Sequence, residues 1–113
     1  MALTEAPWGC LTSEDCEFAR GYVDAGGPLV YLRHLLQDVR PCEGNFGVAY
    51  DNGYLSAFQF TPGSWSSAAR ATGMANPLDP YQVGVNVAWW ILHIADPGST
   101  EGWPTCWHRG SIP

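Results

Sequence analysis

The stretch CEGNFGVAYDNGYLSAFQFTPGSW, residues 42–65, decides the fold class of this 113-residue chain. Within it, Asn52-Gly53 stands between β-prone residues, and this is the strongest local signal for a β-hairpin. We expect two short strands, over residues 46–50 and 54–58. The rest of the chain carries helical patterns, so the hairpin is the only β element that the sequence predicts.

Two helices are expected before the hairpin. Ser13 is a good N-cap, and acidic residues follow it in the first turn, where they suit the positive end of a helix. Apolar residues then recur at helical spacing until Gly26-Gly27 stops the run. A second amphipathic pattern covers residues 28–40, and we expect Pro41 to close it.

Two more helices are expected after the hairpin. Thr61-Pro62 offers an N-cap and a first-turn proline for a helix that Gly73 ends. Asp79-Pro80 opens the most hydrophobic helix of the chain, about 80–95, in the same way. We expect that helix to be buried in the core.

These elements predict one α+β domain dominated by α-helix. At 113 residues the chain fits a single compact domain, and its 46% hydrophobic residues supply ample core material. Residues 1–28, an irregular arm over about 1–11 followed by the first helix, are expected to pack on the domain formed by residues 29–113. We expect a monomer.

Charge and hydropathy exclude two classes of partner. The net charge is −6 and the five basic residues are scattered, which argues against nucleic acid. No apolar run approaches the roughly 20 residues that a membrane-spanning helix needs. The first residues show neither the basic nor the apolar region of a secretion signal. If the protein is exported, we expect a signal outside this chain or another route, such as phage-mediated lysis.

Four cysteines in a short chain favour two disulfides, and three pairings are possible. Zinc is the competing explanation, because the sequence also holds three histidines, His34, His93 and His108. The cysteine and histidine spacings match no compact zinc motif, so we expect no metal and no other cofactor. Disulfides point to an oxidising compartment, which favours a secreted or cell-wall-associated protein, or one delivered by a phage.

Glu43 is the strongest catalytic candidate among the acidic residues. It follows a helix and precedes Phe46 and the hairpin, where partial desolvation would raise its pKa and keep it protonated near neutrality. A protonated Glu is what cleavage of a glycosidic bond requires. Asp51 is a possible second carboxylate, although an Asp before Asn-Gly is first of all a turn residue. Cys42 stands beside Glu43, but nothing else in the sequence supports Cys42 as a thiol nucleophile.

Five short motifs occur in a fixed order, and together they resemble a known family. They are Cys42-Glu43, Asn45-Phe46, Asp51-Asn52-Gly53-Tyr54, Ala57-Phe58-Gln59-Phe60-Thr61-Pro62-Gly63-Ser64-Trp65 and Gly102-Trp103-Pro104-Thr105-Cys106. The chain resembles the transglycosylase-like catalytic domain of resuscitation-promoting factors and related actinobacterial wall-cleaving proteins, in the lysozyme superfamily. The resemblance covers about residues 29–107.

The resemblance implies a lysozyme-like fold with Glu43 as its single catalytic acid. It implies a Cys42–Cys106 disulfide, which leaves Cys10 and Cys16 to pair with each other. Gln59 matches the family's glutamine that faces the cleft. The remaining candidate substrate-binding residues are Tyr54, Trp65 and Trp103, at matching aromatic positions, and Asp51.

We therefore expect an enzyme that cleaves the glycan strands of peptidoglycan or a chitooligosaccharide-like glycan. With one clear acid, either hydrolysis or anhydro-forming transglycosylation remains open. The main alternative is a non-catalytic module that binds cell-wall glycan in a lysozyme-like groove. A small disulfide-bonded interaction or inhibitor protein is a third interpretation, which accounts for the cysteines but not for the ordered motifs.

Overall fold

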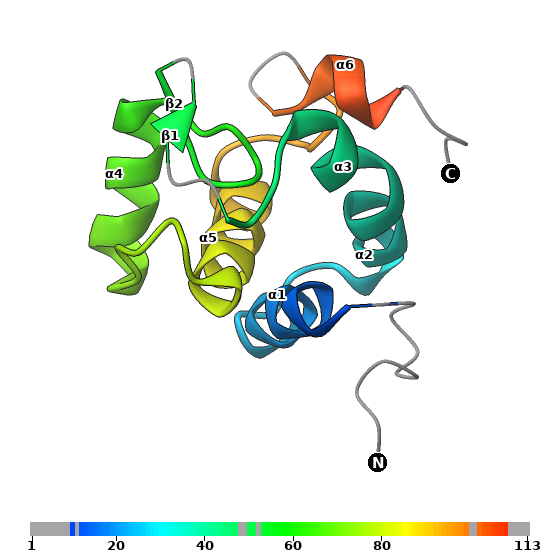
Figure 1. The fold of residues 1–113 in the computed structure, drawn as a ribbon. Coiled ribbons are helices and arrows are strands. Elements are labelled where there is room, and N and C mark those ends of the chain that lie inside the picture. Colours follow the sequence, from blue (N-terminus) through cyan, green and yellow to red (C-terminus); the bar gives the residue numbers. More distant parts are fainter. Residues whose placement is uncertain (1–9, 11, 48–49, 52, 100–101, 109–113) are drawn as a thin grey trace.

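The computed structural model is mainly helical and describes residues 10, 12–47, 50–51, 53–99 and 102–108 (Figure 1). The described part contains six α-helical segments, one π-helical turn and one two-stranded sheet, which is the mainly helical α+β class that the sequence predicts. In chain order they are α1 (Ser13–Asp24), α2 (Leu29–His34), the π-helical turn Leu35–Val39, α3 (Arg40–Glu43), β1 (Tyr50–Asp51), β2 (Tyr54–Leu55), α4 (Pro62–Thr72), α5 (Pro80–His93) and α6 (Pro104–Trp107). None of the described helices combines the length and apolar character that crossing a membrane needs.

Helix α5 is buried in its middle, as its sequence predicts, but near its end Leu92 is 48% exposed. Its residues 83–88 are all buried, and Figure 1 shows it near the middle of the molecule, between α4 and the segment α2–α3. Helix α1 crosses it at very short distance. A Cβ added at Gly84 would lie 2.1 Å from the carbonyl oxygen of Phe18, and one added at Gly21 would lie 2.0 Å from that of Tyr81. Two glycines therefore allow the two backbones to touch.

The predicted caps of α4 and α5 are confirmed. Thr61 accepts a hydrogen bond from the Ser64 amide at 3.1 Å, and Asp79 accepts one from the Tyr81 amide at 3.2 Å. The first helix, however, is capped one residue earlier than expected: Thr12, not Ser13, accepts the Asp15 amide at 3.1 Å. Either hydroxyl could cap the helix. The Asp15 amide lies three residues after Thr12, which suits a bond to the Thr12 hydroxyl.

The prediction that Pro41 closes the second helix is wrong. Helical structure continues to Glu43, and a π-helical turn over Leu35–Val39 directly precedes the proline. There the Arg40 amide donates to the Leu35 carbonyl, five residues back. A proline inside a regular α-helix has no N–H to donate, and its ring clashes with the carbonyl four residues earlier. The wider π turn relieves this conflict, so the chain stays helical and Glu43 lies at the helix end.

The hairpin forms with its turn between Asp51 and Tyr54, but its strands are shorter than the predicted 46–50 and 54–58. Tyr50 pairs with Leu55 and Asp51 with Tyr54, while Val48, Ala49 and Asn52 lie outside the described residues. The second strand ends early because residues 56–59 turn back, and Leu55 pairs with Phe60 instead. This turn buries Ala57 and Phe58 completely in the core, which extended strands would not do.

Two disulfides join all four cysteines, Cys10 to Cys16 and Cys42 to Cys106. These are the pairs that the family resemblance implies. The first lies where the chain enters α1. The second joins α3 to α6 across 64 positions of sequence. Of the expected N-terminal arm, only Cys10 and Thr12 are among the described residues, and Cys10 is fully buried.

Candidate functional site

Glu43 is the last residue of α3, and its carboxyl group is partly withdrawn from water. The side chain is half-buried, and this burial raises its pKa above the ordinary value of 4.5. In the part of the chain that the structure describes, the carboxylate has no salt-bridge partner to lower the pKa again. A carboxyl group in this state holds its proton to higher pH, as a general acid must.

Arg40 secures the backbone just after Glu43. Its carbonyl oxygen accepts the Gly44 amide at 2.8 Å, and its guanidinium donates to the Gly44 carbonyl at 3.0 Å. The same guanidinium lies 3.8 Å from Asp15 Oδ1 and 5.4 Å from the centre of the Phe46 ring. Arg40 was not among the predicted site residues, because an arginine in a helix gives no local sign that its side chain will bond to the residues that follow.

A cleft of about 360 Å³ opens beside the hairpin. It is lined by aromatic, hydroxyl and amide groups, and none of the lining residues is charged. They are Tyr54, Gln59, Phe60, Thr61, Ser64, Trp90, Gly102 and Trp103. Aromatic faces and uncharged hydrogen-bonding groups suit a neutral, polar ligand such as a sugar.

Gln59 connects the cleft with Glu43. It lines the cleft, and an added Cβ on Gly44, the residue after Glu43, would lie 3.5 Å from its side-chain amide nitrogen. The same Cβ would lie 3.2 Å from the Ala57 carbonyl oxygen. The absence of a side chain at Gly44 thus permits close approach of the two segments. Glu43 itself is not among the residues that line the cleft; the residue after it, Gly44, is the one that approaches Gln59.

The backbone of Gln59 is held in the left-handed region, at φ 54°. This conformation is uncommon for a residue other than Gly and costs free energy. The surrounding turn maintains it: the Gln59 amide donates to the Ser56 carbonyl at 3.2 Å, and the Ser56 side chain accepts the Phe58 amide at 3.1 Å. Strained residues concentrate at functional sites, which strengthens Gln59 as a candidate.

The other predicted site residues take different positions. Tyr54 is 43% exposed and lines the cleft, as does Trp103, which is only 5% exposed. Trp65 is also 5% exposed but lies behind the cleft, where its ring packs against Phe60. The Asp51 backbone pairs with Tyr54, and its side chain lies outside the described part.

Hydroxyl groups of α4 reach the cleft as well, although the sequence predicted only a helix cap there. The Thr61 hydroxyl donates to the Ser64 side-chain oxygen at 2.8 Å. Because Thr61 supplies that proton, the Ser64 hydroxyl can donate its own to a ligand. The capping pattern was the available signal, since a capping Thr and a residue three positions later lie together at the helix start.

A metal site finds no support among the described residues. They contain no group of three or more His, Cys, Asp or Glu side chains that could hold an ion. The four cysteines are joined in disulfides, and both ring nitrogens of His34 lie in hydrogen bonds, with Asp38 and with the Trp107 carbonyl.

Comparison with protein-family models, with curated proteins and with solved structures found no significant match to this chain.

Proposed function

We propose that this protein cleaves the glycan strands of peptidoglycan, with Glu43 as general acid in a lysozyme-like site. The observation that carries the proposal is the half-buried Glu43, with its raised pKa, at a helix end whose next residue, Gly44, approaches Gln59 of an uncharged aromatic cleft. The family resemblance of the ordered motifs supports the same assignment. The two disulfides suit an oxidising compartment, so a secreted or wall-associated location forms part of the proposal.

In the proposed reaction Glu43 donates its proton to the glycosidic oxygen between N-acetylmuramic acid and N-acetylglucosamine. The bond from that oxygen to the anomeric carbon then breaks. The anomeric carbon is next attacked either by water, which gives hydrolysis, or by the 6-hydroxyl of the muramic residue, which gives an anhydro sugar. In both cases the attacking hydroxyl loses its proton, and the Glu43 carboxylate accepts it.

Neither route, as proposed, uses a second carboxylate of the protein. Among the described residues that line the cleft there is no Asp or Glu that could act as a nucleophile. In the anhydro-forming route, Glu43 serves as acid and then as base, and the substrate itself supplies the nucleophile. Gln59 and the Ser64 hydroxyl are placed to hold the amide and hydroxyl groups of the sugar while this happens.

Digestion of purified peptidoglycan, followed by mass spectrometry of the soluble products, tests this proposal. We expect disaccharide-peptide fragments with either reducing or anhydro-muramic ends, and the type of end identifies the route. Peptide fragments without glycan cleavage would contradict the proposal, because they would show that a different bond is cut.

One observation favours a second candidate function, a non-catalytic glycan-binding module. Glu43 does not line the cleft, so a sugar could fill the cleft out of reach of the carboxyl group. Such a module would sediment with insoluble peptidoglycan and release nothing. The wild-type chain, incubated with washed peptidoglycan and then centrifuged, distinguishes the two functions by whether glycan appears in the supernatant.

A further inference from the structure

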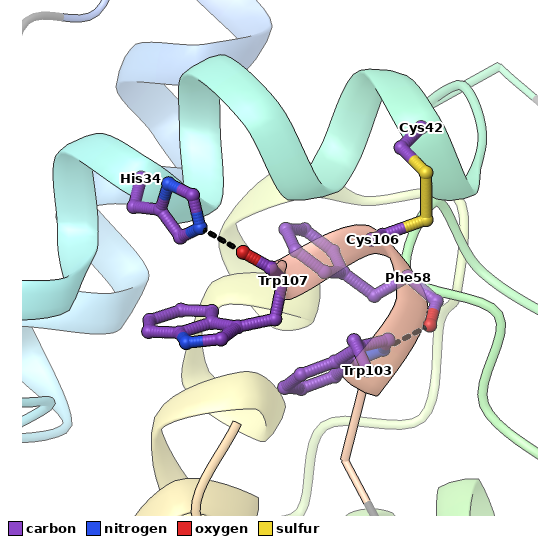
Figure 2. The surroundings of a disulfide bond; sticks show 6 residues. All are labelled: His34, Cys42, Phe58, Trp103, Cys106 and Trp107. Carbon is purple, nitrogen blue, oxygen red and sulfur yellow. Dashed lines mark hydrogen bonds between the residues drawn. A yellow bond between two sulfur atoms is a disulfide. The ribbon is translucent and has the colours of Figure 1, made fainter. Parts of the chain in front are cut away.

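Helix α6 and the residue before it are bonded to both segments that carry Glu43 and Gln59. Figure 2 shows α6 beneath the helical segment that carries His34 and Cys42, with Phe58 beside it. It is a short helix, Pro104–Trp107, preceded by Trp103. Despite this small size, three separate bonds attach it to the rest of the molecule.

One end of α6 holds the turn that contains Gln59. The indole N–H of Trp103 donates to the carbonyl oxygen of Phe58, directly before Gln59 in the chain (Figure 2). The Trp103 ring also packs edge-on against the Phe58 ring, at 5.5 Å between centres. Because Phe58 is fully buried and its carbonyl is bonded, the peptide that joins it to Gln59 has little freedom to rotate.

The rest of α6 holds the helix that ends at Glu43. Cys106 is bonded to Cys42, the residue before Glu43. At the next residue, the Trp107 carbonyl accepts a hydrogen bond from His34 Nε2, and the edge of one ring meets the face of the other at 4.4 Å between centres. His34 and Cys42 lie on one helical segment, so α6 is fixed to that segment at two points (Figure 2).

We propose that Trp103 and Cys106 are positioning residues, which make α6 a strut that sets the gap between Glu43 and Gln59. The catalytic meaning of this gap rests on the proposed function, but the geometric claim does not. The two segments also approach each other directly, where Gly44 lies near Ala57 and Gln59. This approach, the Cys42–Cys106 disulfide and the hydrogen bond from Trp103 to Phe58 together fix the spacing.

The strut has a measurable consequence for Glu43. Its pKa is raised by burial. The helix that carries it is bonded to α6 through Cys42–Cys106, and the next residue, Gly44, approaches the 56–59 turn. If α6 is released, water reaches the carboxyl group and its pKa falls towards the ordinary value. A loss of overall stability alone would not have this effect, because a folded variant would keep Glu43 in the same surroundings.

The test is an NMR titration of the Glu43 carboxyl carbon in paired variants of the full chain. The Cys42→Ser/Cys106→Ser variant lacks the disulfide that joins α6 to α3. The Cys10→Ser/Cys16→Ser variant lacks the other disulfide and is the matched control. We expect a lower Glu43 pKa in the first variant and an unchanged value in the second. The same Glu43 pKa in both folded variants would overturn the proposal.

Trp103→Phe provides the same test if the cysteine variant fails to fold. It removes the indole donor and keeps an aromatic ring, and Trp89→Phe in α5, outside both α6 and the 56–59 turn, is its control. We expect Trp103→Phe alone to lower the Glu43 pKa and to reduce kcat, by up to the order of 10²-fold that misplacement of reacting groups costs. The titration needs no turnover, so an inactive wild type would refute the proposed function and leave this inference standing, whereas an unchanged Glu43 pKa would refute the inference alone.

Discussion

At the scale of single residues, Glu43 links activity to stability. Because its pKa is raised in the folded state, folding favours the protonated form, and the folded state loses stability as the pH rises from the ordinary value of 4.5 through the raised value. Glu43→Gln removes this penalty. We expect the variant to be more stable than the wild type at pH 7 and equal to it below pH 4.5, as measured by thermal unfolding. Equal stability at both pH values would show that Glu43 is fully solvated.

Gln59 is the second residue at which function and stability oppose each other. Glycine adopts its φ of 54° without steric cost, so Gln59→Gly should stabilise the protein, by up to about 1 kcal/mol after the larger entropy of the unfolded chain is counted. The same variant loses the side-chain amide, and we expect weaker binding to peptidoglycan. Denaturant unfolding and co-sedimentation measure the two effects. A variant that binds as well as the wild type would remove Gln59 from the site.

The residues of the site differ in how far the sequence predicted them. Glu43 and Gln59 were predicted from the ordered motifs, because these motifs are local runs of sequence. Arg40 was not predicted, and Trp103 was predicted only as a substrate-binding aromatic residue. Both donate to backbone carbonyls, those of Gly44 and Phe58. Such bonds leave no pattern in the sequence, because any residue supplies a carbonyl group and only the fold brings it within reach.

At the scale of helices and strands, the signals that depend on neighbouring residues were the dependable ones. The caps at Thr61 and Asp79 and the helix end at Gly73 were predicted because each signal acts within a few residues. The early end of the second strand was not predicted, because it follows from the burial of Phe58 against Phe18, with ring centres 4.9 Å apart. The continuation of the helix through Pro41 could not be predicted from neighbouring residues either, because no pattern in this sequence indicates a π turn.

The α1–α5 crossing gives a sharp prediction at this scale. Gly84→Ala would place a methyl group 2.1 Å from the Phe18 carbonyl oxygen, so the helices must separate. We expect a loss of roughly 1–3 kcal/mol of stability, as overpacking costs elsewhere. Gly63→Ala in α4 is the control, since nothing lies within 4 Å of its Cβ and alanine favours a helix, which should stabilise by about 0.5–1 kcal/mol. Chemical denaturation measures the stability of both variants. A Gly84→Ala variant as stable as the wild type would contradict this packing.

At the scale of the whole molecule, the two disulfides are unequal. The Cys42–Cys106 bond spans 64 positions and the Cys10–Cys16 bond spans 6. In the chain-entropy model such loops contribute about 4 and about 2 kcal/mol respectively. We therefore expect Cys42→Ser/Cys106→Ser to lower the free energy of unfolding by about 2 kcal/mol more than Cys10→Ser/Cys16→Ser, by denaturant titration. The opposite order would show that the N-terminal disulfide anchors α1 beyond its loop entropy.

The mainly helical class could be predicted from periodicity and caps, and the presence of two disulfides from the cysteine count. Their pairing came only with the family resemblance, because four cysteines allow three arrangements. The meeting of Glu43, Gln59 and α6 depends on contacts between segments far apart in the chain, such as the bond from Trp103 to Phe58. Such contacts are set by the packing of the whole molecule.

The central claim is that the Glu43 carboxyl group is the general acid of a glycan-cleaving site. Its most direct test is the rate at which soluble glycan is released from purified peptidoglycan by the wild type, by Glu43→Gln and by Glu17→Gln, which removes an exposed carboxylate of α1 as a control. We predict release by the wild type and by Glu17→Gln, and a loss of on the order of 10²–10⁴-fold in the folded Glu43→Gln variant. Release by Glu43→Gln at the wild-type rate would contradict the account.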